Sequence, residues 1–183
     1  MTKYISILRG INVGGKNKIQ MSALKALYEN LGFINIITYI QSGNIIFKNE
    51  TNSLPKYFSK LIEEAIYEQY KLRVPVIIRT LEEMNHIISA NPFLVESNID
   101  IEKLHITFLS ELPEIGISDK MISLNLSSDR FKIREKEIYL YCPNGYGTSK
   151  LSNNFFERKF KVTATTRNWK TVNKLVELAE KLK

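Results

Sequence analysis

The chain has 183 residues, of which 44% are hydrophobic, so it can bury a core and its composition does not indicate intrinsic disorder. Its 26 Lys and Arg residues outnumber its 19 Asp and Glu residues, which gives a formal net charge of +7 and an attraction for anionic partners. The single cysteine, Cys142, excludes an intramolecular disulfide, and no apolar run is long enough to span a bilayer. We therefore expect a cytoplasmic protein with no membrane partner.

The first half of the chain alternates strand and helix patterns in the order β-α-β-β-α-β. The expected elements are a strand at residues 4–8, a helix at 21–31, a hairpin of strands at 34–40 and 44–48, a helix at 53–66 and a strand at 73–79. This order predicts a ferredoxin-like unit, in which an antiparallel sheet carries its helices on one face. Thr80 and Glu83 then predict a capping box for a further helix that ends before Asn91.

The second half repeats this order less clearly. Its expected elements are a strand at residues 103–109, a helix at 113–124, a hairpin at 130–141, a helix at 149–159, a strand at 161–166 and a final helix with its apolar face at 172–182. We therefore predict an α+β fold of two tandem ferredoxin-like units. The first domain covers residues 1–91, including the capping-box helix, and the second covers residues 92–183.

The segment "RGINVGGKNK", residues 9–18, follows the first strand and contains three glycines and three cations. A ferredoxin-like sheet has the strand order 4-1-3-2, so this segment should meet the hairpin tip at residues 41–44. Glycines, amides and cations would then converge as an anion site. The alternative is a tight turn, in which Gly14 and Gly15 supply positive φ and Asn44 bonds the local backbone. The segment matches neither the phosphate loop of NTPases nor the Rossmann fingerprint.

A second edge of the same kind is expected in the other half. There, residues 143–150 ("PNGYGTSK") should lie at the end of the third strand and residues 165–170 ("TTRNWK") at the end of the fourth, on one edge of the sheet. The first segment would lead into a helix with Ser149 and Lys150 in its first turn, where the helix dipole attracts anions. The structural alternative for the second segment is that Asn168 caps the last helix and Trp169 packs against the sheet.

The titratable residues form no recognisable catalytic or metal-binding pattern. His86 and His105 have no carboxylate or cysteine at ligand spacing, and the topology places no histidine as a base for Cys142. We therefore predict no metal site and no cofactor. An enzyme stays open as an alternative, because a single Glu, Tyr or Lys tuned by burial can act as an acid or base.

Three blocks carry a resemblance to a known family: "ILRGINVGGKNKIQMSALKALYENLGF", "TYIQSGNIIF" and "TTRNWKTVNKL". Together they resemble the uncharacterised conserved bacterial proteins grouped as domain of unknown function 1697. The resemblance implies a duplicated ferredoxin-like α+β protein whose biochemical role is not established. It supplies no catalytic residues, so the expected site rests on residue chemistry alone.

The function that these features favour is a cytosolic binding protein for a phosphorylated or otherwise anionic small ligand, such as a nucleotide. The expected ligand-binding residues are Arg9, Asn12, Gly14, Gly15, Lys16, Lys18, Gln41, Ser42, Asn44, Gly145, Gly147, Ser149, Lys150, Arg167, Asn168 and Trp169. One alternative is a nucleic-acid-binding protein without sequence specificity. The other is an oligomeric structural or interaction protein, and the sequence leaves the oligomeric state open.

Overall fold

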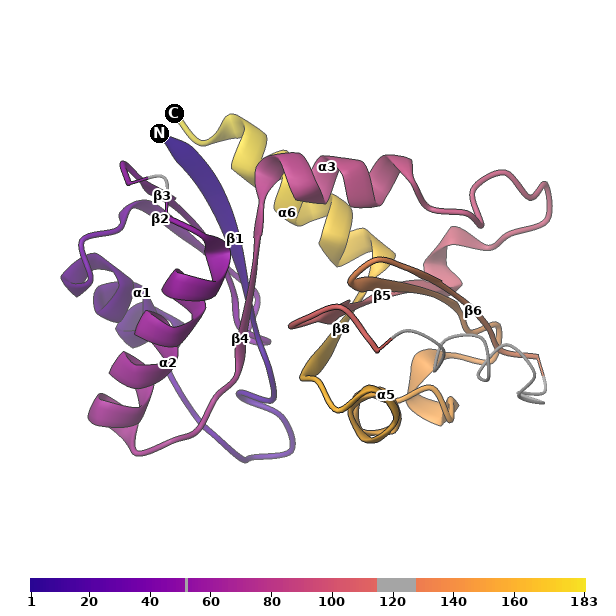
Figure 1. Ribbon diagram of the computed structural model, residues 1–183, viewed down its shortest axis with the longest axis horizontal. Helices are drawn as coiled ribbons and strands as arrows, with labels where there is room; N and C mark the ends of the chain where they lie inside the picture. Colours follow the sequence, from indigo (N-terminus) through magenta and orange to yellow (C-terminus); the bar gives the residue numbers. More distant parts are fainter. Residues whose placement is uncertain (52, 115–127) are drawn as a thin grey trace. The chain divides into compact units, whose positions relative to one another are not determined.

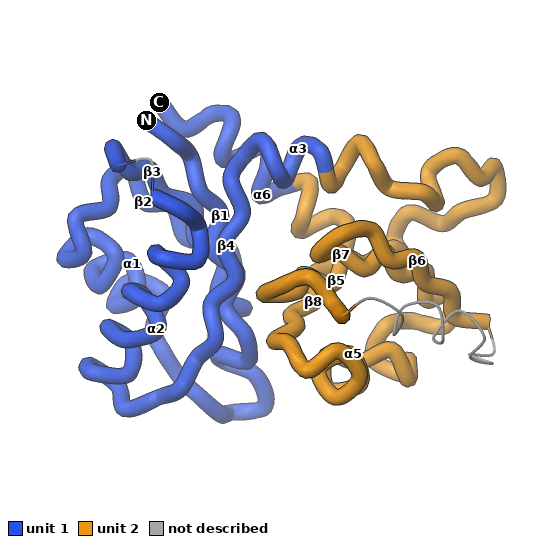
Figure 2. The backbone as a smooth tube through the Cα atoms, viewed as in Figure 1, with its two compact units in different colours: residues 1–86, 174–183 blue, residues 87–173 orange. Residues whose placement is uncertain are grey.

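The computed structural model describes residues 1–51, 53–114 and 128–183 (Figure 1). These residues form an α+β protein with two four-stranded antiparallel sheets and five α-helices, so the predicted α+β class with antiparallel sheets is confirmed. The chain groups into two compact units, which Figure 2 distinguishes by colour. Unit 1 consists of Met1–His86 with Lys174–Lys183, and unit 2 consists of Ile87–Asn173.

Unit 1 contains the first sheet, with the strand order β2-β3-β1-β4 and antiparallel pairing throughout. Its strands are β1 (Thr2–Leu8), β2 (Ile34–Tyr39), β3 (Asn44–Asn49) and β4 (Val76–Thr80). Helices α1 (Met21–Asn30) and α2 (Pro55–Tyr70) pack on one face of this sheet (Figure 1). The element order β1-α1-β2-β3-α2-β4 is the one that the sequence predicted.

An aromatic cluster forms the centre of the unit 1 core. Tyr4 stacks on Phe47 with 5.4 Å between ring centroids, and it meets the edge of Phe58 at 5.0 Å. The hydroxyl group of the fully buried Tyr28 hydrogen-bonds to Ser6 Oγ at 2.7 Å. Tyr4 and Ser6 both belong to β1, so these core contacts hold the strand that leads directly into residues 9–19.

Unit 2 contains the second sheet, with the strand order β6-β7-β5-β8. Its strands are β5 (Leu104–Leu109), β6 (Arg130–Arg134), β7 (Glu137–Tyr141) and β8 (Ala164–Asn168). Helix α5 (Asn153–Phe160) packs on one face through Phe156 and Phe160, which join a core with Ile138 and Leu140. Two short 3-10 helices, η1 (Ile101–Lys103) and η2 (Tyr146–Thr148), border the sheet.

Two sequence predictions in unit 2 need comment. The helix predicted at residues 149–159 begins only at Asn153, because the Ser152 hydroxyl caps it by accepting a hydrogen bond from the Phe155 N–H at 3.2 Å. Ser149 itself has extended backbone angles, φ −71° and ψ 142°. The helix predicted at residues 113–124 falls largely on residues 115–127, outside the described residues.

Helices α3 (Leu81–Ser89) and α6 (Trp169–Lys181) each begin in one unit and end in the other. The predicted capping box is confirmed, since the Thr80 N–H donates to Glu83 Oε2 at 2.7 Å and the Glu83 N–H donates to Thr80 Oγ1 at 3.1 Å. Asn168 caps α6 by accepting from the Thr171 N–H at 2.8 Å, as its sequence position indicated. Among the described helices, none has the length and apolar character needed to cross a membrane.

The last residues of the chain belong to unit 1, whereas the domains expected from the sequence are 1–91 and 92–183. Hydrogen bonds within unit 1 hold this segment in place. Lys3 Nζ donates to the carbonyl oxygen of Glu180 at 3.0 Å, and Asn35 Nδ2 donates to that of Lys183 at 2.6 Å. The C-terminal half of α6 is therefore tied to β1, and Lys183, which follows the helix, is tied to the start of β2.

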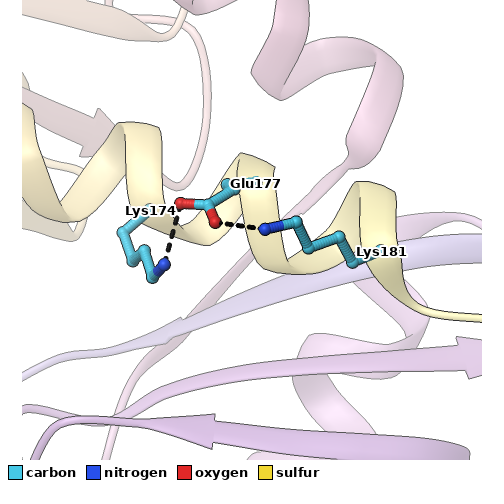
Figure 3. Close-up of polar contacts among 3 residues, drawn as sticks. All are labelled: Lys174, Glu177 and Lys181. Atoms are coloured by element: carbon cyan, nitrogen blue, oxygen red, sulfur yellow. Dashed lines mark hydrogen bonds and ion pairs between the residues drawn. The ribbon is translucent and has the colours of Figure 1, made fainter.

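The same half of α6 carries a charged cluster on its surface (Figure 3). The carboxylate of Glu177 accepts hydrogen bonds from Lys174 Nζ at 2.8 Å and from Lys181 Nζ at 2.6 Å. These bonds, led by the one from Lys174, lower the pKa of Glu177 from its ordinary value of 4.5 to about 2. The cluster favours the ionised carboxylate, although water and salt screen an interaction at this exposed position.

We expect Glu177→Gln to lower the melting temperature slightly at neutral pH and low salt, because the neutral amide loses both ion pairs. The folded pKa lies below the unfolded one, so the stabilisation is present above about pH 4.5 and is lost as the pH falls towards 2. Thermal unfolding of both proteins across this range, with and without added salt, checks the prediction. A difference between them that persists at pH 2 would contradict it.

Candidate functional site

The candidate site in unit 1 is built from two loops at one edge of its sheet, residues 9–19 after β1 and residues 40–44 between β2 and β3. We call them the interlocked loops. The Leu8 N–H donates to the Gly43 carbonyl at 2.8 Å, and the Arg9 N–H donates to the Pro75 carbonyl at 2.8 Å. Asn12 Nδ2 then donates to the Gln41 carbonyl at 2.9 Å. The convergence of these segments, expected from strand order, is confirmed.

Backbone conformation explains the unusual composition of the first loop. The residues with positive φ between positions 10 and 17 are Gly10 (74°), Asn12 (54°), Gly14 (57°), Gly15 (77°) and Asn17 (48°). Glycine and asparagine are the residues that tolerate this left-handed region best. Val13 and Lys16 form an isolated antiparallel bridge, closed by the Lys16 N–H donating to the Val13 carbonyl at 3.0 Å. Gly14 and Gly15 therefore form the centre of a two-residue hairpin turn, which needs positive φ at both positions.

Asn12 holds the two loops together through its side-chain amide. Nδ2 donates to the Ile19 carbonyl at 2.9 Å as well as to Gln41, and Oδ1 accepts from the Ile19 N–H at 2.9 Å. Asn44 has a similar internal role, since it is fully buried and its Nδ2 donates to the Tyr39 carbonyl at 3.1 Å and to Ser42 Oγ at 3.0 Å. The carboxamides of Asn12 and Asn44 are therefore both used in hydrogen bonds that shape the loops.

The exposed side of the interlocked loops is positively charged. Lys16 and Lys18 are exposed, Arg9 is partly exposed, and neither loop contains an Asp or Glu. Gly14 and Gly15 are exposed, and a Cβ atom built on either would meet nothing within 4 Å, so the turn borders open space. The arrangement thus offers backbone N–H groups and ammonium groups to an approaching anion.

The candidate site in unit 2 brings together the ends of β7 and β8, as predicted. The Tyr146 hydroxyl donates to Thr166 Oγ1 at 3.0 Å, and the Cys142 N–H donates to the Lys103 carbonyl at 3.0 Å. The prediction of a helix-dipole site at Ser149 and Lys150 is wrong, because Ser152 caps the helix and its first residue is Asn153. The Ser149 hydroxyl instead donates to Asp129 Oδ2 at 2.7 Å and accepts from the Leu151 N–H at 3.0 Å.

The other predicted residues at this edge have structural contacts. Gly145 has φ 92° and its N–H donates to the Cys142 carbonyl, whereas Gly147 lies within η2. Arg167 Nη1 donates to Thr165 Oγ1 at 3.0 Å and to the Thr166 carbonyl at 2.9 Å. Trp169 is 8% exposed, which leaves little ring surface for a ligand to stack on.

A hydroxyl cluster at this edge was not predicted from the sequence. Thr166 Oγ1 donates to Asn153 Oδ1 at 2.6 Å, because an amide oxygen has no proton to give. Thr166 therefore accepts from Tyr146 and also from Thr107 Oγ1, which lies 2.7 Å away. Thr107 and Thr166 are register partners, so the only sequence signal was a threonine at the matching position of each strand.

His105 stacks on Tyr146 beside this cluster, with 5.0 Å between ring centroids. Its Nδ1 donates to the Lys103 carbonyl at 3.2 Å, since a carbonyl can only accept. Burial lowers the pKa of His105, which favours the neutral ring. In the described ranges, no group of three or more His, Cys, Asp or Glu residues is arranged to hold a metal ion.

Comparison with known proteins gives a family and a fold. The family described as "Protein of unknown function (DUF1697)" matches residues 1–139. The solved structure of a conserved bacterial protein from Streptococcus pneumoniae matches with a TM-score of 0.70 and 24% sequence identity, over 97% of this chain and 98% of that chain. At this identity the structural likeness supports the fold alone. A search of curated proteins finds no match.

We expect Gly43→Ala to destabilise unit 1 more than Gly14→Ala. Both glycines have positive φ, which costs an alanine roughly 1–2 kcal/mol. A Cβ on Gly43 would also lie 2.7 Å from Ile11 Cδ1, and the resulting overpacking adds about 1–3 kcal/mol. Urea unfolding of the two variants measures the difference in the free energy of unfolding, and equal losses would contradict the packing of one loop on the other.

We expect the Cys142 thiol to be unreactive in the folded protein. The side chain is fully buried, and burial raises its pKa to about 11, so the nucleophilic thiolate is scarce at pH 8. A colourimetric thiol reagent should react slowly with the native protein and rapidly after denaturation. Fast modification of the native protein would show that the cysteine environment is accessible and activated.

Proposed function

The chain belongs to the DUF1697 family of proteins of unknown function, as its motifs indicated, and we propose that this member binds an anionic ligand at the interlocked loops. The observation that carries the proposal is the exposed Gly14–Gly15 turn with Lys16 and Lys18 beside it. Asn12 ties the base of the loop that carries this turn to Ile19 and Gln41, so the loop has its shape without a ligand. Such preorganisation lowers the entropic cost of binding.

Phosphate is the anion that best fits this chemistry. Within the described part of the chain, the N–H groups of Gly14 and Gly15 donate to no backbone or side-chain acceptor. A phosphate oxygen can accept from such N–H groups and from the ammonium groups of Lys16 and Lys18 at once. The exposed Gln41 side chain and the partly exposed Arg9 lie on the same loops, and Asn12, Ser42 and Asn44 shape them.

The proposed site in unit 2 has fewer available charged groups than the site in unit 1, and more neutral ones. Lys150 and Lys170 are exposed there, whereas Arg167, Asn168 and Ser149 already hydrogen-bond within the protein. We therefore place the primary anion site in unit 1. Unit 2 would contribute a secondary, purely electrostatic attraction.

We also propose that both units are ferredoxin-like repeats of one ancestral unit. A matching helix-to-strand link supports this proposal. In unit 1, Glu63 Oε1 accepts from the Val76 N–H at 2.7 Å, and in unit 2, Glu157 Oε1 accepts from the Ala164 N–H at 3.0 Å. Each helix also ends at a left-handed lysine, Lys71 or Lys161, with φ of 57° or 59°.

Charge reversal at the turn tests the proposed anion site. We expect Lys16→Glu with Lys18→Glu to weaken binding of pyrophosphate or adenosine triphosphate by at least about tenfold, because two attractive charges become repulsive. Thermal-shift assays and calorimetric titrations at low salt provide the measurement. The matched control is Lys25→Glu with Lys60→Glu, which changes the net charge equally at exposed positions on α1 and α2.

Equal weakening in both double variants would show that binding depends only on net charge. Absence of any stabilisation of the unmodified protein by phosphate-containing compounds would also contradict the proposal. Binding that is lost only when Lys16 and Lys18 are reversed would locate the anion at the interlocked loops.

A further inference from the structure

Two exposed β-branched side chains occupy the tips of the interlocked loops. Val13 is 63% exposed at the edge of the Gly14–Gly15 turn, and Ile40 is 49% exposed between β2 and β3. Ile40 also has φ 51°, a left-handed conformation that is a true outlier for a β-branched residue. An asparagine would suit this position better, both in conformation and in contact with water. Neither core packing nor turn chemistry therefore accounts for an isoleucine there.

Val13 and Ile40 each stand next in the chain to a residue of one hydrogen bond that joins the two loops. Asn12, the neighbour of Val13, donates from Nδ2 to the carbonyl of Gln41, the neighbour of Ile40, at 2.9 Å. Lys16 and Lys18 are exposed on the same loops, which contain no acidic residue. The tips thus combine fixed aliphatic side chains with basic ones, and strain of this kind concentrates at functional sites.

Charge and shape favour a protein as the partner. Single-stranded nucleic acids bind through aromatic stacking in addition to cations, whereas Val13 and Ile40 are aliphatic. Two such side chains offer a membrane less apolar surface than one myristoyl chain, which by itself binds only marginally. An acidic protein surface, by contrast, can accept aliphatic anchors in shallow apolar depressions and pair its carboxylates with the surrounding lysines.

We propose that the interlocked loops dock on an acidic surface of another protein, with Val13 and Ile40 as apolar anchors and Lys16 and Lys18 as partners for Asp and Glu side chains. This inference rests on the proposed anion site and extends it, because the same lysines that would bind phosphate would also pair with the carboxylate groups of a partner protein. It adds a role for the two apolar side chains that a small phosphate compound would not need.

Site-specific photo-cross-linking in cells of the source organism tests the docking surface. A benzophenone amino acid replaces Val13 in the full-length chain, and the matched control carries it at Tyr57, which is 59% exposed on α2 of the same unit. We expect a peptide adduct at position 13, with Asp and Glu adjacent to the cross-link, that is absent at position 57. Its yield should fall at least about tenfold with Lys16→Glu and Lys18→Glu.

The variant Ile40→Asn distinguishes a role of Ile40 in docking from a role in folding. We expect this variant to keep or raise the melting temperature, because asparagine tolerates the left-handed conformation, and to lose the adduct at position 13 by a similar factor. It should still bind pyrophosphate if Lys16 and Lys18 recognise phosphate, so the docking inference and the phosphate site can fail separately. A lower melting temperature would assign Ile40 a structural role and overturn the proposal.

The chemistry of the adduct decides between partner classes. A nuclease-sensitive adduct, a lipid adduct, a peptide without acidic residues at the cross-link, or equal yields at positions 13 and 57 would each overturn the proposal, as would the absence of any adduct. An acidic peptide adduct that depends on Lys16, Lys18 and Ile40 would support it.

Discussion

The carboxamide of Asn12 is the interaction on which the candidate site depends. Its two donor bonds and one acceptor bond join the Ile19 peptide to the Gln41 carbonyl, so a single side chain connects the loop after β1 with the β2–β3 hairpin. These bonds act together with the Val13–Lys16 bridge and the close approach of Ile11 to Gly43 in ordering a segment that has five left-handed residues. They hold the loop that carries the exposed Gly14–Gly15 turn beside the hairpin that carries Ile40.

The two units use similar sheets but place their polar groups at different positions. In unit 1 the interlocked loops lie where β1 ends, beside the start of β4. In unit 2 the hydroxyl cluster joins Tyr146, which follows β7, to Thr107 and Thr166, which pair in the middle of β5 and β8. A shared strand order therefore does not imply a shared site. Unit 1 presents exposed charge, whereas unit 2 presents neutral hydroxyl groups that are already paired with one another.

The interlocked loops carry charged and apolar groups on an exposed surface, and internal hydrogen bonds shape the backbone beneath these groups. For a surface of this kind, charge would steer the approach of an anionic partner, and ordered geometry would limit the entropy that binding costs. Ile40 is the residue of these loops that turn chemistry explains least, and the docking proposal gives it a role.

The sequence alone determined the features that depend on local chemistry. Gly14 and Gly15 indicated a tight turn with positive φ as the alternative to an anion site, Thr80 with Glu83 indicated a helix cap, and the alternation of patterns predicted the α+β class and the element order of unit 1. Tertiary structure decided which polar groups are already used within the protein. Asn12 and Asn44 look like ligand contacts in sequence but hydrogen-bond internally, Trp169 is buried, and Ser152 rather than Ser149 starts α5. Only the contact of Asn12 with Gln41 spans a long stretch of chain, and the pairing of β1 with β3 brings their two loops together. Asn44 and Ser152 bond to residues two to five positions away, and the turn and cap geometry of the folded chain decides those partners.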